Sequence, residues 1–167
     1  VLHLTVNPSE DAPTEKVDII ALTSQVVDAM QVRLNDSPIS IQLDAPEEAI
    51  AIDGNISQIK SVIYNLIDNA IKYSIKGNVL VSIDKINRRN MELKVADQGI
   101  GISKAFQDKI FDQFFRVPSD NVHNVKGYGL GLHNVKQIVE QYDGKITLKS
   151  EEGVGTVFTI KWPISNG

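Results

Sequence analysis

The sequence predicts an α+β fold: a two-layer α/β sandwich with a mixed, mostly antiparallel sheet covered on one face by about three helices. Three segments repeat apolar residues at helical spacing, and the shorter segments between them alternate apolar and polar residues like half-buried strands. The 167 residues, 42% hydrophobic and 23% charged, are enough for one domain with a full core.

The first half of the chain predicts two helices and two strands. Residues 1–16, rich in Pro, Ser and acidic side chains from residue 7, are expected to form a lead-in or linker from an upstream module. Within it, residues 1–6 are expected to form a short strand or the end of a preceding element. The folded domain is expected over 17–167. Within it we expect a helix from Asp18 to about Asn35, strands over 39–43 and 49–52, and a helix over 55–73 that begins with the capping-box pair Asn55 and Gln58.

The second half predicts two hairpins and a last helix. Gly77 ends the preceding unit, and polar residues 116–126 separate the two hairpins. We expect a hairpin of strands 78–86 and 91–96, a short helical piece near 106–111, a helix after glycines 127–131, and a closing hairpin of strands 145–149 and 156–162.

Bulk properties exclude several classes of protein. A formal net charge of -4 argues against a nucleic-acid partner, and the absence of cysteine excludes disulfides and Cys metal sites. No apolar run approaches the roughly 20 residues of a membrane span, and no signal peptide is visible, so this chain is expected not to be membrane-embedded. The first residue, Val1, suggests a fragment of a longer protein.

Gly127, Gly129 and Gly131 alternate with Tyr128 and Leu130 just before an apolar-periodic helix. Alternating glycines allow close approach of the backbone to a ligand, and a helix N-terminus favours a phosphate. Glycine-rich turns also serve as ordinary helix entries, so this pattern alone is weak.

Asn65, Asn69 and Lys72 share one face of the helix predicted over 55–73. The two amides could offer oxygen to Mg²⁺, and the lysine could offer positive charge to phosphates. A solvated helix face is the alternative interpretation. Asparagine is a mediocre helix former, which counts against that alternative.

Asp97 follows an apolar strand and is followed by Gly99 and Gly101. A carboxylate buried at a strand end can accept a hydrogen bond from an exocyclic amine, and the two glycines leave room for a flat ring. An ordinary Asp-x-Gly turn is the alternative.

Phe111, Phe114 and Phe115 lie within five positions and predict a hydrophobic latch before a polar loop. Anchoring of the loop in the core is the alternative, and it is expected to hold for at least one of them. Arg116, at the edge of the latch, could reach a phosphate.

The ordered set of these four motifs resembles the catalytic ATP-binding domain of sensor histidine kinases, a HATPase domain of Bergerat type. Residues 65–74 (NLIDNAIKYS) resemble its N box, 97–101 its G1 box, 111–115 its F box and 127–131 its G2 box. The resemblance covers roughly residues 17–162. It implies a catalytic ATP-binding domain over 17–167, in an ATPase group shared with gyrase, chaperone and mismatch-repair enzymes.

The resemblance implies roles for residues around ATP and Mg²⁺. Asn69 would ligate the metal, with Asn65 beside it near the phosphates. Lys72 would pair with a phosphate, and Arg116 would neutralise the γ-phosphate from a lid over 112–126. Tyr73 would pack on the adenine or bond near it, and Asp97 would accept the adenine amino hydrogen. The other nucleotide-binding positions are Gly99, Gly101, Ile102, Phe115, Gly127, Gly129, Leu130 and Gly131.

One departure from the wider group favours transfer over hydrolysis. Hydrolytic members carry a glutamate four residues before the metal-binding asparagine, as general base for water. The same position here is Asn65, which cannot take a proton at neutral pH. A protein-histidine kinase is therefore favoured over an ATPase.

The phosphoacceptor is expected outside this chain. His3, His123 and His133 are its histidines, and none stands in the family's acceptor motif. His133 occupies a position where the family more often has a small residue, so a crowded helix entry is expected. The implied partners are a histidine-containing dimerisation module, in cis or in trans, and a response regulator. The implied location is the cytoplasm, with the parent protein anchored in the inner membrane.

Two other functions stay open at this point. One is a nucleotide-dependent binding module that transfers nothing, and the other is a serine kinase of the anti-sigma type from the same ATPase group. Rossmann binding is disfavoured because the glycines follow a polar stretch rather than a strand. The P-loop and protein-kinase motifs are missing.

Overall fold

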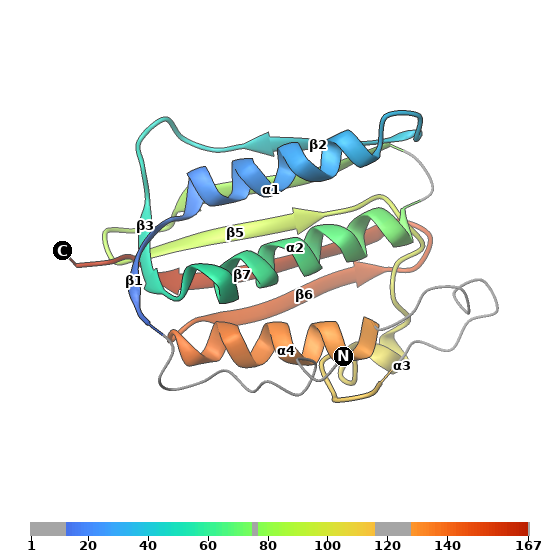
Figure 1. The fold of residues 1–167 in the computed structure, drawn as a ribbon. Coiled ribbons are helices and arrows are strands. Elements are labelled where there is room, and N and C mark those ends of the chain that lie inside the picture. The colour runs from blue at the N-terminus through green and yellow to red at the C-terminus, as the bar shows by residue number, and fades with distance from the viewer. Residues whose placement is uncertain (1–12, 75–76, 116–127, 167) are drawn as a thin grey trace.

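A five-stranded sheet forms one layer of the molecule, and three long helices cover one of its faces (Figure 1). The structure is a computed structural model that describes residues 13–74, 77–115 and 128–166. The elements are β1 (Glu15–Asp18), α1 (Ile19–Arg33), β2 (Ile39–Asp44), β3 (Ala51–Gly54), α2 (Ile56–Tyr73), β4 (Gly77–Lys85), β5 (Asn90–Ala96), α3 (Lys104–Gln107), α4 (Tyr128–Gln141), β6 (Lys145–Glu151) and β7 (Gly155–Pro163). The predicted α+β two-layer sandwich is confirmed.

The strands of the large sheet lie in the order β2-β4-β5-β7-β6. β2 pairs with β4 in parallel, and the other three pairings are antiparallel, as expected for a mixed, mostly antiparallel sheet. The predicted hairpins are β4–β5 and β6–β7. β5 and β7 pair although far apart in the sequence, and this pairing brings Ala96, just before Asp97, opposite Val157.

Side chains that accept a hydrogen bond cap the N-termini of α1 and α2. The Asp18 carboxylate accepts the Ala21 N–H at 3.0 Å, and the Asn55 side chain accepts the Gln58 N–H at 3.1 Å. The second half of the predicted capping box is replaced, because the Gln58 side chain accepts a hydrogen bond from the Tyr142 hydroxyl. This bond ties the start of α2 to the end of α4.

The core lies between the helices and one face of the sheet. In β5, Met91, Leu93 and Val95 alternate as buried residues with more exposed ones, as a half-buried strand requires. The apolar side of α2 packs against this layer through Ile59, Val62, Ile63, Leu66, Ile67 and Ala70. On the opposite face of the sheet, Leu80 of β4 is 38% exposed.

The structure differs from the expected elements in three places. β1 pairs antiparallel with β3 in a small separate sheet that the sequence pattern did not predict, because Val17 is the one buried residue of β1. β1 spans the expected boundary between the lead-in (1–16) and the folded domain (17–167). That boundary remains a prediction. β3 begins two residues later than expected, and α3 begins near Lys104 rather than Phe106 because the Ser103 side chain accepts the Ala105 N–H.

Two expected segments, the strand over 1–6 and the polar stretch 116–126, lie outside the described residues. Within the described ranges, none of the helices combines the length and the apolar character needed to cross a membrane.

Replacing the same side chain on the two faces of the sheet tests this layering. Leu66→Ala, at a fully buried position of α2, is expected to lower the free energy of unfolding by about 2–5 kcal/mol because it leaves a cavity. Leu80→Ala, on the uncovered face, is the matched control and is expected to cost less than about 1 kcal/mol. Urea unfolding measures both, and equal losses would contradict the assignment of the covered face.

Candidate functional site

A hollow opens between α2, the end of β5, α4 and the start of β7. Apolar side chains form most of its wall, and a few polar groups face it, as is typical of small-molecule sites. Its lining residues are Asn69, Tyr73, Asp97, Ile100, Gly101, Ile102, Ile110, Leu132, Thr156 and Phe158. Five residues predicted from the motifs therefore meet here: Asn69, Tyr73, Asp97, Gly101 and Ile102.

Asp97 is the carboxylate of this hollow, and two backbone amides hold it in place. Its Oδ1 accepts the Gly99 N–H at 2.9 Å and the Thr156 N–H at 3.2 Å, while its own N–H donates to the Thr156 carbonyl at 2.9 Å. Burial raises the pKa of Asp97 above its ordinary value of 3.8 and outweighs the two amide hydrogen bonds, which lower it. The site thus holds a rigid hydrogen-bond acceptor in partly desolvated surroundings.

The glycines after Asp97 are required by close backbone packing. A methyl group at Gly99 would overlap the Tyr73 carbonyl at the end of α2, and one at Gly101 would overlap the Glu151 carbonyl at the end of β6. Gly101 also has a φ of 73°, in the left-handed region. Gly101 lines the hollow, and the role of both glycines in shaping a base pocket remains a prediction.

The polar face of α2 is only partly solvated. Asn69 is 6% exposed and lies at the hollow, so the solvated-face alternative is wrong at this position. Asn65 is half-buried; its Nδ2 donates to the Ser61 hydroxyl at 3.3 Å, and its Oδ1 faces Gly131 of α4. Lys72 is exposed and pairs with Asp68 at 3.0 Å. Of these three predicted residues, Asn69 alone reaches the hollow, and the phosphate roles of the other two remain predictions.

The three phenylalanines of the expected latch differ in environment. The Phe111 ring packs edge-on against Phe158, a wall of the hollow, with centroids 6.1 Å apart. The Phe115 ring lies 5.9 Å from that of Phe106. Phe114 is 71% exposed and has a φ of 66°, unusual for a residue with a side chain. Anchoring therefore describes Phe111 and Phe115, and Arg116 lies outside the described residues.

The glycine motif before α4 is partly helical rather than a loop. α4 begins at Tyr128, so Gly129, Leu130 and Gly131 belong to its first turn, and Gly127 lies outside the described residues. The first-turn N–H groups of a helix have no partner within it, so this end of α4 retains the capacity to bind an anion.

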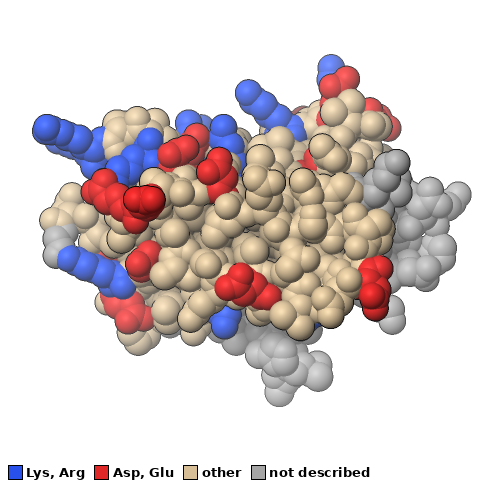
Figure 2. Space-filling model, turned by 90° about the horizontal axis from the view of Figure 1, so that it is seen from above, with Lys and Arg blue, Asp and Glu red and all other residues tan. Residues whose placement is uncertain are grey.

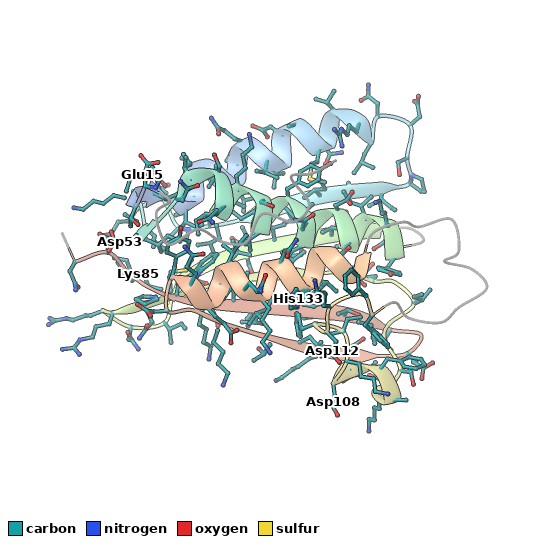
Figure 3. All side chains as sticks on the ribbon, turned by 60° about the horizontal axis from the view of Figure 1, so that its bottom comes forward. Glu15, Asp53, Lys85, Asp108, Asp112 and His133 are labelled. Carbon is teal, nitrogen blue, oxygen red and sulfur yellow. The ribbon has the colours of Figure 1, made fainter. Side chains whose placement is uncertain are left out.

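His133 lies on α4, which continues through it, and its Nδ1 lies 3.2 Å from the Phe111 carbonyl. The expected crowding of the helix entry remains a prediction. Figure 3 shows His133 on α4 beside the turn that carries Asp112. His3 and His123 lie outside the described residues.

Thr156 is the buried polar residue of the hollow that the motifs missed. It is 5% exposed, lines the hollow and donates its N–H to Asp97. A methyl group at the preceding Gly155 would overlap the Asp97 carbonyl. A sequence signal for this position exists, because residues 153–155 repeat the Gly-x-Gly pattern of residues 99–101. From the sequence alone, we interpret these glycines only as the turn of the closing hairpin.

Charged side chains of both signs lie among one another on the face of the molecule seen in Figure 2. No continuous basic stripe crosses the described part of this face.

Asp97→Asn tests the electrostatics of the hollow without a ligand. A raised folded-state pKa gives stability that is fully present below about pH 3.8 and is lost as pH rises through the folded pKa. Asparagine keeps an oxygen acceptor and does not titrate. The free energy of unfolding of the variant minus that of the wild type is therefore expected to increase with pH across this window. Urea titrations at several pH values measure it, and a decrease would contradict the burial of this charge.

Several known proteins resemble this chain in sequence. Residues 54–166 match the model of the family described as "Histidine kinase-, DNA gyrase B-, and HSP90-like ATPase". The sensor-like histidine kinase SenX3 of Mycolicibacterium smegmatis is 38% identical over 150 residues, covering 89% of this chain and 38% of the relative. The sensor protein RprX of Bacteroides fragilis is 38% identical over 138 residues, covering 81% of this chain and 26% of the relative. The chain thus spans well under half the length of these relatives.

Two solved structures share the fold. The mycobacterial sensor histidine kinase MprB superposes with a TM-score of 0.77 at 28% identity, covering 90% of this chain and 98% of the other. Full-length ShkA in complex with AMPPNP superposes with a TM-score of 0.82 at 26% identity, covering 99% of this chain and 34% of the other. The expected resemblance to the catalytic ATP-binding domain of sensor histidine kinases is confirmed, and the chain belongs to the histidine kinase-, DNA gyrase B- and HSP90-like ATPase family.

Proposed function

We propose that this chain binds Mg²⁺-ATP in the hollow around Asp97 and transfers the γ-phosphoryl group to a histidine of a separate dimerisation module. The observation that carries this proposal is the Asp97 carboxylate, which two backbone N–H groups hold in a mainly apolar hollow. The same hollow contains the buried side-chain amide of Asn69. ATP use agrees with the family, whose matched region includes both residues. The proposed partners are the dimerisation module, in cis or in trans, and a response regulator, with a parent protein anchored in the inner membrane and this chain in the cytoplasm.

The base would lie against the apolar wall. Ile100, Ile102 and Leu132 offer flat contact to a ring, and Asp97 offers a hydrogen-bond acceptor. The adenine 6-amino group is a donor, which matches this acceptor, whereas the 6-oxo group of guanine is itself an acceptor. Burial strengthens the preference because an unpaired acceptor is costly away from water.

The phosphates would lie toward the first turn of α4. The unpaired N–H groups of this turn and its positive dipole end favour negative charge. Asn69, buried on α2 facing the hollow, would supply an amide oxygen to Mg²⁺, a ligand type that suits this hard cation. The described residues contain no group of three or more His, Cys, Asp or Glu side chains able to hold a metal, so phosphate and water oxygens would complete the coordination. Bound Mg²⁺ neutralises phosphate charge.

Transfer to a protein nucleophile is favoured over hydrolysis. Asn65, half-buried and facing α4, holds no titratable group that could activate water. Phosphoryl transfer depends chiefly on positioning and charge neutralisation, and a histidine ring can attack without a base on this chain. Lys72 would contribute charge after exchanging Asp68 for a phosphate oxygen.

Asp97→Asn is expected to weaken ATP binding at least tenfold while leaving the fold intact. Wild type should bind Mg²⁺-ATP in the micromolar range, an ordinary affinity for a nucleotide site. The variant turns an amide N–H₂ or a weaker acceptor toward the adenine amino group, and loss of a charged hydrogen bond is worth about 1.5–3 kcal/mol. Calorimetric titration measures both proteins. Asp84→Asn, on an exposed part of β4, is the matched control, and equal affinities in all three proteins would contradict the assigned base site.

Mixing the chain with the parent protein's helical module and ATP labelled at the γ-phosphate tests the reaction. We expect an acid-labile, base-stable label on the module, the signature of phosphohistidine. Asn69→Ala is expected to reduce the label at least tenfold, since it removes the proposed metal ligand. ATP binding without any label on the module would favour the binding-module alternative, and a label on serine would favour the anti-sigma type of kinase.

A further inference from the structure

We propose that Ser150 is a positioning residue that fixes the Thr156 hydroxyl as a hydrogen-bond acceptor toward the hollow, and so selects 6-amino over 6-oxo purines. This inference rests on the proposed nucleotide site. Ser150 lies on β6 directly opposite Thr156 of β7, and its side chain is on the helix-covered face of the sheet with those of Ile146 and Leu148. None of the motifs of the site includes it.

Three contacts surround the Ser150 hydroxyl. Its Oγ accepts the Ile102 N–H at 2.7 Å, donates to the Gly155 carbonyl at 3.1 Å, and lies 2.8 Å from the Thr156 Oγ1. A hydroxyl has one hydrogen to donate and two lone pairs to accept with. Three partners therefore saturate Ser150.

Only one arrangement of hydrogens makes all three contacts hydrogen bonds. The Gly155 carbonyl can only accept, so the single Ser150 hydrogen points to it. The Ile102 N–H can only donate, and it occupies one lone pair of Ser150. The Thr156 hydroxyl must then donate its own hydrogen to the second lone pair. Thr156 is left with lone pairs alone for any group in the hollow.

The fixed direction of the Thr156 hydroxyl determines which ligand groups this wall can bind. Thr156 is buried, lines the hollow and is joined to Asp97 through its backbone N–H, so two acceptors stand at the same wall. A 6-amino group offers hydrogens to such a wall, whereas a 6-oxo group meets only lone pairs. A threonine hydroxyl that was free to rotate would donate to the 6-oxo group and relax this discrimination.

Gln107 provides a control at the same contact. Its Nε2 donates to the carbonyls of Ile102 at 2.8 Å and of Ser150 at 3.2 Å. It therefore joins the same two segments as the Ser150 hydroxyl does, but touches neither the Thr156 hydroxyl nor its hydrogen. Loosening this contact through Gln107 separates a packing effect from an effect on hydrogen-bond direction.

The experiment compares the affinities of the intact chain for ATP and inosine triphosphate by displacement of a fluorescent ATP analogue. The two nucleotides differ in the 6-substituent and in the hydrogen that the 6-oxo base carries on N1. Wild type is expected to prefer ATP. Ser150→Ala is expected to lower the ratio of the two affinities at least fivefold, and Ser150→Thr, which keeps the hydroxyl, to retain it. Gln107→Ala is expected to weaken both ligands alike and leave the ratio unchanged.

The outcomes separate this inference from the proposed function. Failure of wild type to bind ATP would overturn both. If wild type binds ATP, two results would overturn the role of Ser150 but not the proposed function. One is an unchanged ratio of ATP affinity to inosine triphosphate affinity in Ser150→Ala. The other is a drop of this ratio in Gln107→Ala equal to that in Ser150→Ala. Should Ser150→Ala fail to fold, Ser150→Cys carries the same expectation and the same contradicting result, because a thiol is a weak donor and acceptor.

Discussion

The site depends on the hydrogen bonds of one carboxylate, that of Asp97. By accepting the N–H groups of Gly99 and Thr156, it joins the turn after β5 to the start of β7. These segments are far apart in the sequence and meet because β5 and β7 are neighbours in the sheet. Asp97 thus helps to form the wall of the hollow, and its carboxylate is also the charged group that this wall presents to a ligand. Its burial raises its pKa, which shows that the arrangement costs desolvation.

Close backbone packing keeps that carboxylate in place. Glycine is required at positions 99, 101 and 155 because side chains there would overlap the carbonyls of Tyr73, Glu151 and Asp97. The end of α2, the β6–β7 turn and the end of β5 can therefore approach one another closely. Asn69 and Tyr73, at the C-terminal end of α2, are held at a fixed distance from Asp97 by the same contacts. In the proposed function, recognition of the base by Asp97 and placement of the metal ligand Asn69 would share this support.

The sequence predicted the parts of the site that lie within local motifs. Asn69 and Asp97 could be assigned because each stands in a pattern that a plain helix face or strand end does not require. Thr156 and Ile110 could not, since they reach the hollow only through strand pairing and through the turn after α3. Phe114 was grouped with two anchored phenylalanines, and a positive φ that no local pattern encodes leaves it exposed. β1 was missed because a four-residue strand with one buried side chain carries almost no periodic signal.

Binding of ATP with its base at the Asp97 wall can be observed at individual amides. The most direct measurement is a two-dimensional amide NMR titration of the ¹⁵N-labelled chain with Mg²⁺-ATP, and with Mg²⁺-tripolyphosphate as the control that lacks a base. We expect the amide resonances of Gly99 and Thr156, whose N–H groups donate to the Asp97 carboxylate, to shift with ATP and not with tripolyphosphate. Unchanged resonances at both amides, in a chain saturated with ATP, would contradict binding of the base at this wall.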